Sequence, residues 1–343
     1  MTALLYPVRG MNYSSGLGPL AYARGTATVV ASLVILLGGA ANVRAECGDS
    51  GVALQILGSG GPFGTGRASA GYIVWVDGVS RVMVDAGGGT FAHFHESRAN
   101  LADLDLLALS HFHPDHSAEV PAILWPRGGN LRVAGPSGSE GFPSLDGFLG
   151  GLFGPEGVFR VLTSRATFDP ITVDVKATAP TEVLRKGSLV VTAQGVPHGN
   201  VPALGYRVEV GDASIVFSSD QNGSDPGFTE FSKEADVLVV HFAGSEEPRG
   251  GQGRGGQARG GQGRGGQGPG GQGRGGARGG GQGSSLHAKP SVWGQIAADA
   301  EVKNLVLSHI SSGQDFEANV GHLKSRYSGP LTVAEDMMCL GVE

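Results

Sequence analysis

The sequence contains little cysteine, and its two cysteines lie far apart. Cys47 and Cys339 are the only cysteines among 343 residues. No third cysteine exists to join the pair, so neither looks like a metal ligand. Two interpretations of the pair stay open. The cysteines form a disulfide, as an oxidising compartment permits, or they are two unrelated thiols.

The apolar run near the start of the chain is too short to cross a membrane. It covers residues 27–41, ATVVASLVILLGGAA, which is 15 residues, whereas a spanning helix needs about 20. Arginines precede the run, and small side chains stand before Glu46. This pattern is typical of a secretory signal peptide over residues 1–45, cleaved after Ala45. We therefore expect a periplasmic or secreted protein with no membrane anchor after cleavage; an uncleaved anchor is the alternative.

Basic residues are scarce outside two segments of the chain. Residues 1–45 hold three arginines and residues 249–283 hold six, and neither segment has an acidic residue. Removing these nine from the 25 lysines and arginines leaves 16 basic residues against 31 acidic ones, a net charge of −15. A surface with this much negative charge repels polyanions. The charge therefore does not favour nucleic-acid binding.

Residues 249–283 form a low-complexity segment that repeats glycine, glutamine and arginine. The segment has no apolar side chain larger than proline, so it cannot offset the entropy lost on ordering. We predict a disordered insertion within a single hydrolase domain that spans residues 46–343. An RNA-binding arginine-glycine tract is the alternative interpretation of this segment.

The rest of the chain alternates between strand-like and helical patterns. Early strands are predicted at 52–57, 72–77, 81–84 and 104–110, with a helix at about 90–99. Later strands are predicted in LRVAG, LVVTA, YRVEV, ASIVFSS, ADVLVV and KNLVLSH, with a helix in PSVWGQIAADA. The mixture of meander and alternating order predicts two sheets with helices outside, a four-layer αββα arrangement.

The segment LSHFHPDH, residues 109–116, carries a dense group of metal-ligand side chains. One residue separates His111 from His113, so an extended backbone sends both imidazoles to the same side. Asp115 and His116 stand in the following turn and can serve a second metal. Imidazole and carboxylate without thiolate suit zinc, and they also accept manganese or iron.

Three later strands end in further side chains of the ligand type. His198 lies in GVPHG, Asp220 ends ASIVFSSD, and His309 ends KNLVLSH. A carboxylate such as Asp220 can bridge two metals, because each of its oxygens can bind one ion. The sequence thus predicts a site that holds two metal ions, which we expect to be Zn²⁺.

These motifs together resemble the metallo-β-lactamase superfamily, within it the ribonuclease Z and arylsulfatase-like phosphodiesterase branch. The other supporting segments are LGSGGP (57–62), VMVDAGGGT (82–90) and LRVAGPSG (131–138). The resemblance implies the metallo-β-lactamase αββα sandwich. It also implies that His111, His113 and His198 hold the first metal. By the same resemblance Asp115, His116 and His309 hold the second, Asp220 bridges the two, and Asp85 braces the metal loop.

The resemblance also extends to residues beside the metal ligands. His287 matches a histidine that approaches the scissile phosphate in ribonuclease Z-like proteins. His241 matches the start of a His-Glu-Ala-Thr motif, but Phe242 stands in place of the glutamate. The carboxylate that orients the catalytic histidine is then missing unless Glu246 or Glu247 replaces it. The remaining histidines match no ligand position, and we expect them on the surface: His93, His95 and His322.

The expected function is that of an exported dinuclear zinc hydrolase. A hydroxide that bridges the metals would attack a small phosphodiester or a related sulfate ester. In this scheme Asp115 orients the hydroxide, and His287 stabilises or protonates the leaving oxygen. The alternatives are a ribonuclease Z-like tRNA 3′ endonuclease, a lactone or β-lactam hydrolase, and a metal-binding protein of the same fold without catalysis.

Export is the first testable prediction. Because the apolar run is short and small residues stand before the cleavage point, material recovered from the periplasm or medium should begin at Glu46. Intact-mass measurement gives the start of the chain directly. A full-length chain found in the cytosol would contradict the prediction.

Overall fold

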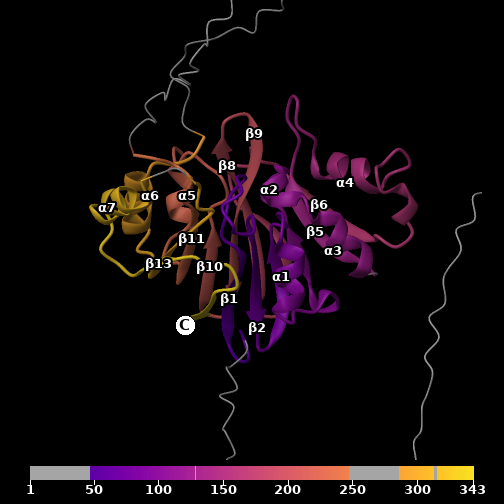
Figure 1. Ribbon diagram of the computed structural model, residues 1–343, viewed down its shortest axis with the longest axis horizontal. Helices are drawn as coiled ribbons and strands as arrows, with labels where there is room; N and C mark the ends of the chain where they lie inside the picture. The colour runs from indigo at the N-terminus through magenta and orange to yellow at the C-terminus, as the bar shows by residue number, and fades with distance from the viewer. Residues whose placement is uncertain (1–46, 128, 247–285, 313–314) are drawn as a thin grey trace, which may run out of the picture. The chain divides into compact units, whose positions relative to one another are not determined.

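Two sheets form the centre of the computed structural model, the first built from strands of the first half of the chain with one strand from its end, the second from strands of the second half (Figure 1). The structure describes residues 47–127, 129–246, 286–312 and 315–343. The predicted signal segment 1–45 and the insertion 249–283 lie outside the described residues. From Cys47 onward these residues belong to one compact unit. None of the described helices is both long and apolar enough to cross a bilayer.

Each sheet has seven strands among the described residues. The first sheet has the order β14 (Cys339–Val342), β1 (Val52–Gly58), β2 (Gly71–Val76), β3 (Val79–Val84), β4 (Leu106–Ala108), β5 (Leu131–Pro136) and β6 (Phe168–Val173). The second has the order β13 (Leu331–Val333), β12 (Asn304–Ser308), β11 (Val237–His241), β10 (Ala213–Phe217), β9 (Val201–Val210), β8 (Leu189–His198) and β7 (Thr181–Lys186).

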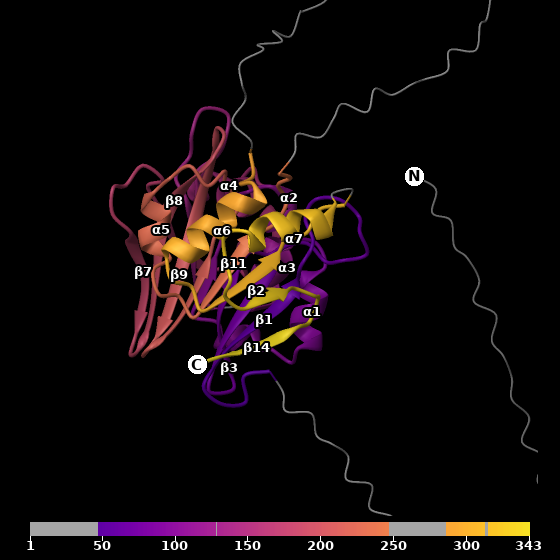
Figure 2. The ribbon, with the colours of Figure 1, turned by 90° about the vertical axis from the view of Figure 1, so that its left-hand side faces the viewer.

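Helices cover the outer face of each sheet (Figure 1). Those on the first sheet are α1 (Thr90–Glu96), α3 (Val120–Arg127) and α4 (Leu145–Phe153), with short 3-10 turns η1 (Leu101–Asp103) and η2 (Arg160–Leu162). The short helix α2 (Pro114–Ser117) follows β4, and its buried residues are Asp115, His116 and Ser117. Those on the second are α5 (Gly227–Phe231), α6 (Pro290–Asp299) and α7 (Phe316–Lys324), seen in front of the strands in Figure 2. The predicted αββα sandwich is confirmed.

Strand β1 shows how the sequence produces these layers. Its side chains alternate between two faces, and both faces are buried. Leu54 and Ile56 pack between the sheets, while Ala53 and Leu57 pack against the outer helices. A strand buried on both faces therefore reads as a nearly continuous apolar run, which is why this strand is predictable from sequence.

The four strands that the sequence did not predict are the four sheet edges: β14 and β6 in the first sheet, β13 and β7 in the second. These edge strands are partly solvated, so they lack a clear apolar pattern; β13, for example, has no fully buried residue. Two predicted elements are also shorter than expected. The helix from 90 ends at Glu96, and the strand at 104–110 is only β4.

A disulfide joins Cys47, just before β1, to Cys339, at the start of β14. This settles the two open interpretations in favour of the disulfide. Strand β14 pairs with β1 in antiparallel register, with Cys339 opposite Gln55. The bond closes a loop with a sequence separation of 292 residues. Such a constraint lowers the entropy of the unfolded chain and is worth roughly 2–4 kcal/mol.

Candidate metal centre

The candidate ligands collect at one edge of the sandwich because parallel strands end there together. Strands β3 and β4 are parallel in the first sheet, and β10, β11 and β12 are parallel in the second. Loops after the carboxyl ends of such strands converge on a common crevice. The side chains at or just after these ends are Asp85 (β3), His111 (β4), Asp220 (β10), His241 (β11) and His309 (β12).

Backbone strain marks the same edge. Asp85, Ser219 and His309 adopt left-handed conformations, with φ of 58°, 57° and 52°. A non-glycine residue in this region costs about 1–3 kcal/mol, and it persists only where its surroundings hold it firmly. The strained backbone here serves to direct side chains of the strand ends into the crevice.

His111, His113, His198 and Asp220 form the first donor set, with one ligand atom from each lying within 4.8 Å of all the others. His111 Nε2 lies 2.9 Å from His113 Nδ1. His198 Nε2 lies 3.7 Å from Asp220 Oδ2 and has no hydrogen-bond partner in the described structure. A buried nitrogen without a partner, facing a carboxylate, fits a metal ligand.

The local sequence explains the first donor set. His111 and His113 share one side of an extended segment, and Phe112 between them turns away to stack on Phe148, 4.4 Å between ring centroids. The Nδ1 of His198 lies 3.1 Å from the backbone carbonyl oxygen of Leu286. Because a carbonyl only accepts, Nδ1 carries the proton and Nε2 keeps the lone pair that a metal needs.

His116, Asp220, His241 and His309 form the second donor set by the same 4.8 Å criterion. His116 Nε2 and His309 Nε2 lie 3.3 Å apart. Asp115 adjoins this set, since its Oδ2 lies 3.1 Å from His309 Nε2. The structure therefore brings together all seven residues that the sequence predicted as ligands.

His241 is a member of the second donor set that was not predicted as a ligand. Its Nδ1 lies 2.8 Å from Asp220 Oδ1, and its Nε2 lies 3.3 Å from the hydroxyl of Tyr72. Tyr72 in turn lies 2.9 Å from Ser308 Oγ. The available signal was position alone, because His241 ends a strand parallel to those that end before Asp220 and His309.

Asp85 supports the segment 109–116 through hydrogen bonds to Ser110 and His116. Its carboxylate accepts hydrogen bonds from the backbone N–H and the hydroxyl of Ser110. It also lies 2.8 Å from His116 Nδ1. The Nδ1–H of His116 therefore donates to Asp85, which leaves Nε2 directed toward the second donor set. Such a carboxylate behind a histidine fixes the ring and raises its basicity as a ligand.

Burial and charge set the protonation of the donors. Burial lowers the pKa of His111 well below its usual value, so this imidazole is neutral. Burial opposes ionisation of Asp220 and Asp115, but nearby histidines outweigh it: the pKa of Asp220 falls well below its usual value and that of Asp115 falls to about 2. Ionised carboxylates and neutral imidazoles are the forms that bind divalent metals.

His116 differs from the other donors. Burial disfavours its charged form, yet the carboxylates of Asp85, Asp220 and Asp115 outweigh burial and raise its pKa to about 9. These three carboxylates thus favour the protonated form of His116. A cation bound at the second donor set would replace this proton, since both neutralise the same carboxylates.

His287 borders the site from the side of α6. Its ring centroid lies 5.4 Å from that of His198 and 6.0 Å from that of His309. Its Nδ1 lies 3.8 Å from Asp220 Oδ1. Glu246 does not orient it, because that carboxylate accepts hydrogen bonds from the N–H and hydroxyl of Ser291 at the start of α6. Glu247 lies outside the described residues.

The three histidines expected on the surface lie away from both donor sets. His95 and His322 are exposed. His93 is only partly exposed, and its Nδ1 hydrogen bonds to the carbonyl of Leu57 in β1. The surface expectation is thus wrong in part for His93, which helps to fix α1 on the first sheet.

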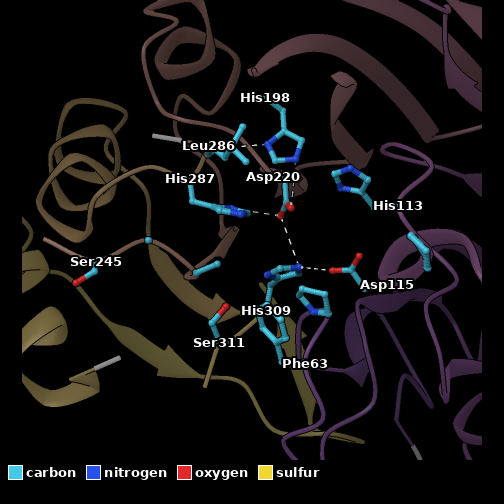
Figure 3. Close-up of a pocket in the computed structure, with 14 residues that line it drawn as sticks. Phe63, His113, Asp115, His198, Asp220, Ser245, Leu286, His287, His309 and Ser311 are labelled. Carbon is cyan, nitrogen blue, oxygen red and sulfur yellow. Dashed lines mark hydrogen bonds and ion pairs between the residues drawn. The ribbon is translucent and has the colours of Figure 1, made fainter. Parts of the chain in front are cut away.

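An open cavity of about 640 Å³ lies over the two donor sets (Figure 3). His113, Asp115, His198, Asp220, His287 and His309 all line it. A substrate in this cavity would contact both donor sets at once. A concave site with converging ionised groups is the usual form of an active site.

This fold and cavity define a metallo-hydrolase of the metallo-β-lactamase fold. A family model described as a β-lactamase superfamily domain matches residues 80–310, more than half of the chain. The chain belongs to this superfamily.

Similar proteins include an uncharacterized protein and a ribonuclease Z. An uncharacterized protein of Mycobacterium tuberculosis is 23% identical over 285 residues, covering 82% of this chain and 88% of that protein. A ribonuclease Z of Kineococcus radiotolerans is 28% identical over 211 residues, covering 58% of this chain and 62% of that protein.

Solved structures share the fold. The metallo-β-lactamase fold protein YhfI of Bacillus subtilis matches with a TM-score of 0.60 and 19% identity, over 84% of this chain and 98% of that one. The short form of human tRNase Z matches with a TM-score of 0.60 and 17% identity, over 85% of this chain and 99% of that one.

Metal content tests the donor sets. If Asp220 serves both, the wild-type protein should bind close to two divalent ions, and Asp220→Ala should lose metal from both sets. His198→Ala should lose the first ion and His309→Ala the second, because each removes a donor from one set only. Elemental analysis after dialysis measures the stoichiometry. His322→Ala, an exposed histidine, is the matched control. A wild-type protein that binds no metal after reconstitution would refute the site.

Proposed function

We propose that this protein is an exported hydrolase that uses two zinc ions to cleave a small phosphodiester or a related sulfate ester. The observation that carries the proposal is the position of Asp220. Its Oδ2 lies 3.7–3.9 Å from ring nitrogens of His198, His116 and His111, and its Oδ1 lies 3.7 Å from His309 Nε2. A carboxylate between two groups of imidazoles suits the bridge of a dinuclear site.

The donors fit zinc by their chemistry. Imidazoles and carboxylates without thiolate bind zinc well, and they also bind manganese or iron. His111, His113 and His198 would hold one ion, Asp115, His116 and His309 the other, and Asp220 both. Both ring nitrogens of His241 already have partners, Asp220 and Tyr72, so it would support Asp220 rather than bind an ion. When bound, such a pair of ions supplies an activated water nucleophile and neutralises charge on the entering and leaving oxygens.

The protein's own residues would orient the reactants. Asp115 is ionised and lies between the second donor set and the cavity, where its carboxylate can accept a hydrogen bond from the attacking water. His287 lines the same cavity, and burial lowers its pKa. The neutral imidazole would donate a hydrogen bond to the leaving oxygen and stabilise the charge that develops there.

Charge favours a small substrate over RNA. A tRNA-processing enzyme binds its long polyanion largely through lysine and arginine, whereas the chain outside 1–45 and 249–283 has a net charge of −15. Between β5 and β6, α4 packs Leu145, Leu149 and Phe153 into the core, so this helix belongs to the folded domain. The named ribonuclease Z relatives favour tRNA 3′ cleavage as the second candidate.

Two features support export as part of the proposal. The segment 1–45 has the pattern of a cleaved secretory signal. The disulfide between Cys47 and Cys339 is the form that cysteines take in an oxidising compartment. We accordingly propose a periplasmic or secreted location.

A comparison of substrates tests the proposed reaction. Bis-p-nitrophenyl phosphate should be hydrolysed by the zinc-loaded protein, and Asp115→Ala should lower kcat/KM by about a hundredfold or more. Precursor tRNA should be cut slowly or not at all, because the acidic surface repels it. The assay is run at low and at physiological salt, with p-nitrophenyl sulfate and nitrocefin alongside. Efficient 3′ trimming of precursor tRNA at physiological salt would instead establish the ribonuclease function.

A further inference from the structure

We infer that the substrate is a diester with a single negative charge and an apolar or aromatic group on each side of the scissile centre, with Leu286 contacting one group and Phe63 the other. The inference rests on the proposed function. It adds the chemistry of the two substituents and the residues that recognise them.

Leu286 and Phe63 are exposed apolar side chains that line the metal cavity. Phe63 is 60% exposed and Leu286 50% exposed. Because both line the cavity, they offer apolar contact area to the parts of a ligand that flank the metal site. Figure 3 shows Leu286 beside His198 and Phe63 beyond His309, on opposite sides of Asp220.

Leu286 is fixed relative to the first donor set. Its carbonyl accepts the hydrogen bond from His198 Nδ1, which holds the Leu286 backbone beside that ligand. A methyl group at Gly199 would lie 2.8 Å from Leu286 Cδ2. The glycine therefore leaves the space that this leucine side chain occupies.

Phe63 is fixed relative to the second donor set by its loop. Gly61 lies against the His309 ring, where an added Cβ would come within 2.9 Å of Cε1. The ends of the loop are joined to Asp336, whose carboxylate accepts hydrogen bonds from the backbone N–H groups of Ser59 and Ala68. The contacts at the two ends of the loop therefore place Phe63 next to the second donor set.

The charge of the cavity limits the charge of the substrate. No lysine or arginine is present among the described residues that line it. Enzymes that take terminal phosphates or polyphosphates meet the additional charge with cationic side chains. Among the described lining residues, His287 would face the scissile group together with the bound cations, which suits a monoanionic diester. A diester also has two substituents, one for each apolar side chain.

Binding of stable diesters tests the inference separately from catalysis. Diphenyl phosphate should bind to the zinc-loaded full chain about a hundredfold more tightly than dimethyl phosphate, because each ring contact is worth about tenfold. Phe63→Ala and Leu286→Ala should each weaken diphenyl phosphate binding about tenfold and leave dimethyl phosphate binding unchanged. Calorimetric titration measures the Kd values, and elemental analysis confirms that both variants keep their metal.

Val158→Ala and Val161→Ala are the matched controls, since both valines are exposed apolar side chains outside the cavity. Their affinities should equal those of the wild type. Equal binding of diphenyl and dimethyl phosphate, or variants at positions 63 and 286 that bind like the wild type, would overturn the inference even if diesters are hydrolysed. Selective binding of diphenyl phosphate without turnover of any diester would uphold the two contacts and refute the proposed reaction.

Discussion

The site depends on one buried carboxylate. Asp220 is 3% exposed, and a carboxylate taken out of water without partners costs several kcal/mol or more. Histidines from both sheets surround it, His111 and His116 from the first, His198, His241 and His309 from the second. Two bound cations would compensate the negative charge of buried Asp220 more completely than the imidazoles alone. Because the imidazoles come from both sheets, they meet around Asp220 only when the two sheets pack correctly.

Contacts between the sheets keep the two halves of the site in register. Tyr72 on β2 of the first sheet is fully buried, and its hydroxyl lies near His241 and Ser308 of the second sheet. Tyr206 on β9 donates a hydrogen bond to the carbonyl of Leu109, two residues before His111. The apolar layer between the sheets thus carries a few polar contacts, and each of them ends beside a candidate ligand.

Much of this arrangement follows from the sequence, and the exceptions have physical reasons. The seven predicted ligands share a local signal, because each stands in or just after a strand with a readable apolar pattern. His241 was harder to identify as a donor, since its contact with Asp220 arises only when β10 and β11 pair. Glu246 hydrogen bonds to Ser291 and not to His287, and this pairing depends on where α6 begins. The edge strands and the pairing of Cys47 with Cys339 are also products of tertiary structure, which no local pattern records.

The central claim is that Asp220 bridges two metal ions. Crystals of the zinc-loaded protein, measured on both sides of the zinc absorption edge, locate those ions directly by their anomalous scattering. The account predicts two peaks about 3.5–4 Å apart, one beside His111, His113 and His198 and one beside Asp115, His116 and His309, with a carboxylate oxygen of Asp220 bound to each. A single peak, or two peaks of which only one touches Asp220, would contradict it.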